Sequence, residues 1–288
     1  MTSETFDRTA EDVGNIVLLE HVNVTVPDER VASLFYVHAL GLTRDPYITY
    51  PTLTWINVGA QQFHLPTGDA QVIRGVTEVV VPDVEVLERR LARAAKHLAG
   101  TEFAWERVNG PGDEAELSVR GPWGNRLRCR APAAGAAMEL GMASVEFPVS
   151  SGAAEGVAAF YREVLGAPAT VEDGLCVVDA GPGQALRFRE TDEPLVDYDG
   201  HHLAIYIADF SGPHRRLFDR DLIVEESNDH QYRFNWIVDP ASGQPLFEIE
   251  HEVRSLSHPL FGRPLVNRNP EQGLQPYRPG LDTYRPGG

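Results

Sequence analysis

The stretch Leu19 to Leu42, LEHVNVTVPDERVASLFYVHALGL, decides how the rest of the chain is organised. His21, Asn23 and Thr25 alternate with valines, which is the period of two that is typical of a half-buried strand. A Pro-Asp turn follows, and apolar residues then recur at helical spacing up to Gly41, in the position of a C-cap glycine. The stretch therefore predicts a strand, a turn, a helix and a glycine stop.

The same unit returns in the second half of the chain. Phe35 corresponds to Phe160, an offset of 125 residues, and the Leu-Gly pairs that end the two helices correspond as well. Repeats of solenoid proteins are much shorter, so this offset indicates a duplicated domain. Two more strand-turn-helix starts lie at residues 76–98 and 202–218, and three further strands are expected after each helix. The predicted fold class is α+β, with four βαβββ units in two tandem mixed-sheet domains.

The predicted domains cover residues 17–132 and 141–258, joined by a small-residue linker and followed by a Pro/Gly-rich tail at 259–288. Such a tail cannot build elements of its own, so it either wraps the protein or is disordered.

Composition narrows the classes of partner. The net charge of −17 is spread along the chain, which argues against binding nucleic acid or an anionic membrane. No apolar run reaches the ~20 residues of a membrane span, and the N-terminus lacks the form of a secretion signal. Cys129 and Cys176 are isolated, which excludes a disulfide framework and favours a cytoplasmic protein. We expect a small-molecule substrate. The sequence leaves open whether the chain forms a homo-oligomer.

The motifs resemble those of the vicinal oxygen chelate superfamily, which includes glyoxalase I, extradiol dioxygenases and bleomycin-resistance-type binding proteins. The resemblance rests on units that open with H-V-x-V-x-V-P-D, continue with F-Y-x3-L-G and close on a G-N-R-L-type strand. It covers residues 17–252 and implies cupped, incomplete barrels, each around a cleft. Fold alone does not give a reaction, so the site has to be sought in individual residues.

The resemblance implies metal ligands at two places in each unit: the head of the first strand and the middle of the last. The heads are His21, Thr77, Ser144 and His202, and the last-strand positions are His64, Arg128, Arg187 and Glu248. Potential ligands thus occur only in units one and four. Imidazoles with a carboxylate bind divalent transition metals, with Fe(II) as the first choice here and Mn, Ni, Co or Zn as alternatives.

Two pairings of the units remain open. If units three and four share a cleft, as in extradiol enzymes, Ser144 stands where a histidine is needed. If units one and four share it, as in the exchanged pairing of glyoxalase-like dimers, His21, His64, His202 and Glu248 converge on one ion. Ligand count favours the exchanged pairing, with Glu250 as the reserve carboxylate.

Further residues are candidates for proton transfer: His201, Tyr206, His230 and Tyr232. Four others near the C-terminus are expected to be surface or tail contacts: His251, Glu252, Arg254 and His258.

Three functions fit these patterns. The first is a metal-dependent enzyme that cleaves the ring of a catechol-like substrate with O2. The second is a glyoxalase-like isomerase in which Glu248 carries the proton. The third is a metal-free binding protein of the resistance type, in which aromatic side chains stack on a planar guest: Trp55, Phe63, Phe234 and Trp236.

Overall fold

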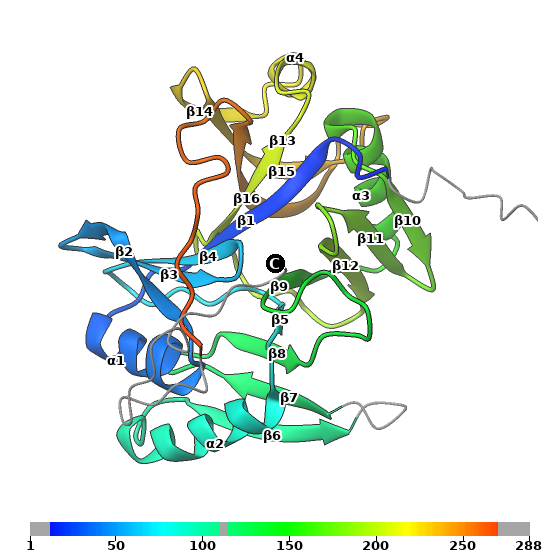
Figure 1. Ribbon diagram of the computed structural model, residues 1–288. Coiled ribbons are helices and arrows are strands. Elements are labelled where there is room, and N and C mark those ends of the chain that lie inside the picture. Colours follow the sequence, from blue (N-terminus) through cyan, green and yellow to red (C-terminus); the bar gives the residue numbers. More distant parts are fainter. Residues whose placement is uncertain (1–11, 110–114, 270–288) are drawn as a thin grey trace, which may run out of the picture.

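The computed structural model describes residues 12–109 and 115–269, so the tail expected at 259–288 lies outside the described residues from position 270 onward. It shows four consecutive βαβββ units (Figure 1). Unit one comprises β1 (Ile16–Asn23), α1 (Glu29–Ser33), η2 (Leu34–Ala39), β2 (Thr43–Tyr50), β3 (Leu53–Val58) and β4 (Gln61–Pro66). Unit two comprises β5 (Val76–Val80), α2 (Val84–Ala94), η3 (Ala95–His97), β6 (Ala104–Asn109), β7 (Ala115–Arg120) and β8 (Arg126–Arg130). Unit three comprises β9 (Gly141–Ser150), α3 (Ala154–Phe160), η4 (Tyr161–Leu165), β10 (Ala169–Glu172), β11 (Leu175–Asp179) and β12 (Ala185–Thr191). Unit four comprises β13 (His202–Ile207), α4 (Ser211–Phe218), β14 (Ile223–Asn228), β15 (Gln231–Val238) and β16 (Pro245–Ser255).

The units pair in the exchanged manner. One eight-stranded sheet has the order β14-β15-β16-β13-β1-β4-β3-β2, and the other has the order β10-β11-β12-β9-β5-β8-β7-β6. Units four and one therefore share the first sheet, joined by the antiparallel pair β1 and β13. Units three and two share the second sheet, joined by β9 and β5. The pairing that ligand count favoured is confirmed, and each sheet draws one unit from each half of the sequence.

The helices begin and end where local chemistry requires. Asp28 caps α1 by accepting hydrogen bonds from two backbone amides of its first turn, and Asp83 caps α2 in the same way through Val86. Gly41 and Gly166 end the helices of units one and three with positive φ angles of 80° and 73°. A glycine adopts this left-handed conformation without the steric cost of a side chain, so both helices stop at these positions.

Helix packing holds each half of the sequence together across the two sheets. Phe35 of η2 contacts Phe103 of unit two, with ring centroids 6.0 Å apart. Phe160 of α3 contacts Phe234 of β15 in unit four, at 5.8 Å. These rings belong to one extended hydrophobic core. The opposite faces of the strands are thus left for polar side chains. No helix among the described residues is long and apolar enough to cross a membrane.

A β-bulge interrupts β1 at the point where polar residues gather. Leu19 pairs with Ile205 and His21 pairs with Ala204, so Glu20 is an extra residue on β1. A bulge breaks the alternation of faces. Glu20 and His21 consequently lie next to each other on the polar face, although they are neighbours in sequence.

The described part of the tail crosses the first sheet as a strap, residues 256–269, drawn in orange in Figure 1. Asn267 fastens it by two hydrogen bonds with the backbone of Gly59, at 3.1 and 2.8 Å. Arg263 adds an ion pair with Asp45 at 2.7 Å. In this part of the chain, the tail wraps the protein.

Candidate metal centre

Three histidine rings meet on the face of the first sheet that is turned away from the hydrophobic core. His21 lies on β1, which runs between β4 with His64 and β13 with His202. The ring centroids of His21 and His64 lie 3.7 Å apart and are stacked, whereas those of His21 and His202 lie 5.6 Å apart, edge to face. Trp55 stacks on His64 at 3.9 Å. The structure thus brings together the three histidines of units one and four.

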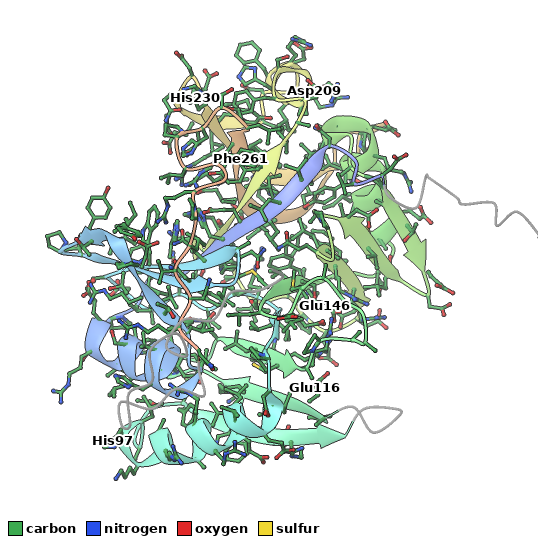
Figure 2. The ribbon with its side chains drawn as sticks, in the orientation of Figure 1. His97, Glu116, Glu146, Asp209, His230 and Phe261 are labelled. Atoms are coloured by element: carbon green, nitrogen blue, oxygen red, sulfur yellow. The ribbon has the colours of Figure 1, made fainter. Side chains whose placement is uncertain are left out.

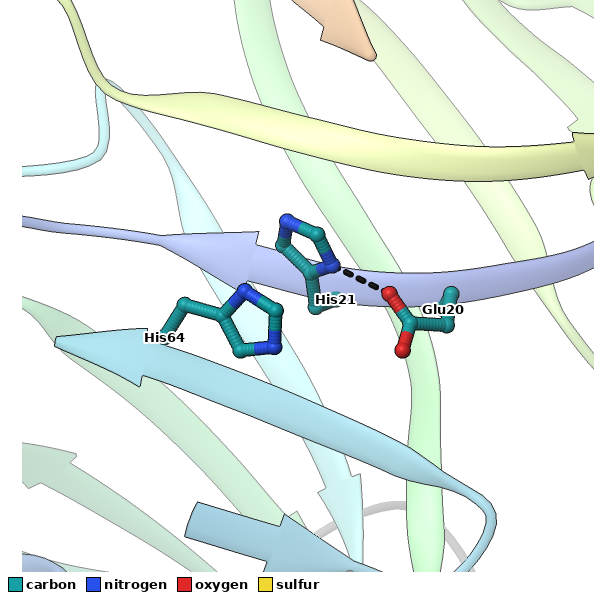
Figure 3. A group of neighbouring side chains, drawn as sticks. All are labelled: Glu20, His21 and His64. Carbon is teal, nitrogen blue, oxygen red and sulfur yellow. Dashed lines mark hydrogen bonds and ion pairs between the residues drawn. The ribbon is translucent and has the colours of Figure 1, made fainter. Parts of the chain in front are cut away.

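Two carboxylates complete ligand groups around His21. Glu20 accepts a short hydrogen bond from His21 Nδ1, which Figure 3 shows beside His64. Glu252 of β16 places Oε2 at 3.6 Å from His202 Nε2. Among the described residues, ligand atoms come within 4.8 Å of one another in two groups: Glu20, His21 and His64, and His21, His202 and Glu252. His21 belongs to both groups.

Two arginines hold the carboxylates in place. Arg254 lies 2.5 Å from Glu252 and 3.2 Å from Glu20, and Arg233 lies 2.5 Å from both Glu250 and Glu252. A guanidinium group repels a cation. However, three carboxylates against two guanidinium groups leave a formal charge of −1 among these side chains. The local balance therefore still favours a divalent cation.

Burial keeps the three imidazoles neutral. Burial, together with Arg254, holds the pKa of His21 well below its ordinary value, and burial does the same for His64 with His21 as the second cause. Burial and then Arg233 lower the pKa of His202 to about 3. Neutral imidazole is the form that binds transition metals, so these rings can act as ligands without first losing a proton.

His21 gives the most direct sign that a metal fits. Its Nδ1–H donates to Glu20, so the neutral ring carries its lone pair on Nε2. His21 Nε2 is buried and has no hydrogen-bond partner. A buried polar atom without a partner costs free energy, and a divalent cation held with His202 and Glu252 would supply that partner. The residues present therefore fit the metal that the fold implies.

Glu248, the carboxylate expected from the sequence, is in neither ligand group of the described residues. The ladder between β13 and β16 begins with His202 beside Glu250, so β16 reaches the histidines only there. Glu248 lies two residues before Glu250 on β16, where it pairs with Trp236 of β15. The structure thus places Glu252, and not Glu248, beside the histidines.

The difference has a physical cause. The last strand of unit four is longer than that of unit two, because β16 has 11 residues whereas β8 has 5. The extra length of β16 pairs with β15 before it meets β13. Ladder register gives the correct equivalence: His64 stands two residues after the partner of His21, and Glu252 stands two residues after the partner of His202.

The proton-transfer candidates of β13 separate into two positions. Tyr206 is buried beside the centre, with its hydroxyl 3.4 Å from Arg254 Nη1. His201 is held away from the ligand groups, because its Nδ1 forms a 2.6 Å hydrogen bond with Asp199. Its other nitrogen, Nε2, is buried without a partner.

The candidates around β15 lie apart from the histidines. Tyr232 packs on the core side of the sheet, where its ring contacts Phe210 at 5.0 Å. His230 belongs to the turn between β14 and β15, near the top of the molecule in Figure 2. Neither residue joins a ligand group among the described residues. Arg233, which alternates with Tyr232 along β15, faces the centre instead.

Three residues of the centre, Glu20, Glu252 and Arg254, were not predicted from the sequence. Glu252 and Arg254, expected at the surface, are only 3% and 6% exposed. His251, expected there too, is buried on the core side and hydrogen-bonded to Tyr161. The alternation in the segment FEIEHEVRS could have revealed that Glu252 and Arg254 share the face of Glu250. Likewise, two residues separate Leu19 from the next core residue, Val22, where regular alternation has one, and this marks the bulge at Glu20.

The second sheet carries ion pairs at the corresponding face. Arg128 and Arg130 pair with Glu78 of β5 at 3.8 and 2.6 Å, and Arg187 pairs with Glu146 of β9 at 3.4 Å. Glu78 lies on this face with Arg128 and Arg130, so its neighbour Thr77, expected at the head of unit two, points to the opposite face of β5. The described residues of this sheet include no group of metal ligands like those around His21.

Comparison with known proteins gives structural matches only. No family model and no curated protein matches the sequence. Glyoxalase I from Zea mays superposes with a TM-score of 0.61 at 14% identity, over 84% of this chain and 93% of that one. A presumptive dioxygenase from Bacillus subtilis superposes with a TM-score of 0.59 at 14% identity, over 87% of this chain and 91% of that one. At such identities, the likeness concerns the fold, and the chemistry has to be argued from the side chains.

Proposed function

We propose that this chain, which has the two-domain vicinal oxygen chelate fold, is a divalent-metal-dependent enzyme acting on a small molecule with two adjacent oxygens. The observation that carries the proposal is His21, which has a buried, unpartnered Nε2 and belongs to a ligand group with His202 and Glu252. His64 is the fourth candidate ligand. Fe(II) is our first choice of metal because two histidines and one carboxylate form the facial set used by non-haem iron oxygenases.

The metal would act as a Lewis acid that holds both substrate oxygens. The protein's own residues prepare that position. Glu20 accepts a hydrogen bond from the Nδ1–H of His21 and so keeps the lone pair of Nε2 available, as carboxylates beside metal-ligating histidines commonly do. Arg254 fixes Glu20 and Glu252 at once. Tyr206, whose hydroxyl lies 3.4 Å from Arg254 Nη1, would hydrogen-bond a substrate oxygen or pass a proton to it.

Oxidative ring cleavage of a catechol-like substrate is the reaction we propose first, because the facial ligand set leaves positions for a substrate and O2. Glyoxalase-like isomerisation is the second candidate. The exchanged pairing of units and the additional carboxylate Glu20 favour it, since a carboxylate beside the substrate can carry a proton.

The test is anaerobic purification, metal analysis and turnover of a catechol panel with and without O2. Ring cleavage predicts O2 uptake equal to the substrate consumed and no reaction without O2. Turnover that continues without O2 would exclude ring cleavage and leave isomerisation. A preparation that binds no divalent metal at all would contradict the proposal as a whole and favour a metal-free binding protein.

A further inference from the structure

A cavity of about 560 Å³ lies beside the candidate metal centre. Leu18 of β1, the turn between β3 and β4, the linker around Met138, and residues 260–267 of the strap line it. Glu20 belongs both to this wall and to a ligand group around His21. The volume lies within the range of small-molecule sites, so a molecule held at the centre has room to extend here.

The charges in this wall are already compensated. Among the described residues that line the cavity, Glu20 and Arg263 are the formally charged ones. Glu20 is paired with Arg254 at 3.2 Å, and Arg263 is paired with Asp45 at 2.7 Å. Arg263 Nη1 has no hydrogen-bond partner, but the charge of this guanidinium group is already compensated by Asp45. A charged group entering the cavity would lose hydration without gaining an opposite charge.

The side-chain amides of Gln184 and Asn267 are also occupied at both ends, and that of Gln61 is occupied at its oxygen. Gln184 bonds the backbone of Leu19 through both ends of its amide and reaches Met142 as well. Gln61 accepts from the amide of Met142 at 3.0 Å, and Asn267 is fastened to Gly59. These side chains hold the wall together. What remains for a ligand is mainly apolar surface: Leu18, Met138, Leu140, Leu260, Phe261 and Leu265.

We propose that this cavity binds the uncharged, apolar part of the substrate, and that Phe261 of the strap determines which molecules fit. Phe261, labelled in Figure 2, contacts the ring of Tyr206 at 5.0 Å and keeps 39% of its surface exposed. It thus presents an aromatic face directly beside the candidate centre. The inference rests on the proposed function in one respect: the proposed function assigns the oxygen-bearing end of the same substrate to the metal.

The experiment uses the full chain freed of metal with EDTA and a matched pair of fluorescent probes. N-phenyl-1-naphthylamine is uncharged, and 8-anilino-1-naphthalenesulfonate is a close analogue that carries a sulfonate. We expect one uncharged probe per chain and at least ~10-fold weaker binding of the sulfonate, because its charge finds no partner. Equal or tighter binding of the sulfonate would overturn the inference.

Variants locate the probe. Phe261→Ala should weaken binding of the uncharged probe by ~10-fold, since an aromatic contact contributes about this much. Ala60→Trp, which adds an indole to an exposed wall position, should also displace the probe. Phe218→Ala is the control, because Phe218 is 63% exposed on α4 and absent from the wall.

Unchanged probe affinity in both wall variants, or an equal loss in Phe218→Ala, would contradict the inference. Metal content is measured separately on the untreated protein. Absence of metal with the expected probe pattern refutes the proposed function and leaves the apolar site standing. Metal binding without the probe pattern refutes the apolar site and leaves the proposed function standing.

Discussion

Glu248 and Glu252 lie on the same strand but differ in what they can reach. Glu252 approaches His202 at 3.6 Å, whereas Glu248 is paired with Trp236 and is outside both ligand groups. Glu252→Gln should therefore lower the affinity for Mn(II) by at least ~10 to 100-fold, which is already typical for loss of an outer-shell partner. Glu248→Gln, the matched control, should keep the affinity within about twofold. Calorimetric titration measures both, and the opposite order would contradict our assignment of the carboxylate.

Arg254 is a single residue that stabilises the carboxylates of the centre. Its side chain is 7% exposed and compensates Glu20 and Glu252 together. Arg254→Met should lower the free energy of unfolding by about 3 to 5 kcal/mol, because it leaves buried carboxylates unpaired. Urea denaturation of metal-free protein measures this change.

Arg107→Met is the comparison for Arg254, because Arg107 pairs with Glu85 and Glu88 at the protein surface. Exposed pairs contribute little to stability. An equal loss in both variants would mean that the network around Arg254 does not stabilise the fold.

At the scale of elements, the order of strands and helices follows from sequence patterns. In unit one, the alternation from His21, the Pro-Asp turn and Gly41 predict the strand, the turn and the helix end correctly, and Gly166 does the same for the helix end of unit three, since each signal acts locally. The bulge at Glu20 and the long first part of β16 depend on pairing with strands of unit four. The alternation of residues along a single strand therefore did not predict them.

The turn between β3 and β4 joins the cavity wall to the linker. Gly59 has a φ of +66°, and a Cβ at this position would lie 1.9 Å from the carbonyl oxygen of Leu140. Gly100 has a similar φ of +87°, but a Cβ there would meet nothing within 4 Å. Gly59→Ala should therefore destabilise the protein more than Gly100→Ala, which suffers only the conformational cost of about 1 kcal/mol or more. Thermal unfolding decides, and equal shifts in Tm would contradict this close packing.

At the scale of the whole molecule, the exchanged pairing explains how residues from both ends of the chain share one site. The sequence places potential ligands only in units one and four, and ligand count then favours their association. The sequence predicts that the three histidines lie together, as the structure shows, because each stands at a strand position equivalent between units. Glu20, Glu252 and Arg254 were not predicted, because register across β1, β13 and β16 decides which side chains reach the centre.

The most direct measurement of the central claim is the metal content of His21→Ala and His202→Ala. These residues are 181 positions apart in sequence, yet their rings lie 5.6 Å apart. If one ion is shared between units one and four, each substitution should reduce bound metal well below one ion per chain. His38→Ala, at an exposed position of η2, should keep the wild-type content. With folding verified by circular dichroism, full retention of metal by His21→Ala would contradict the shared centre.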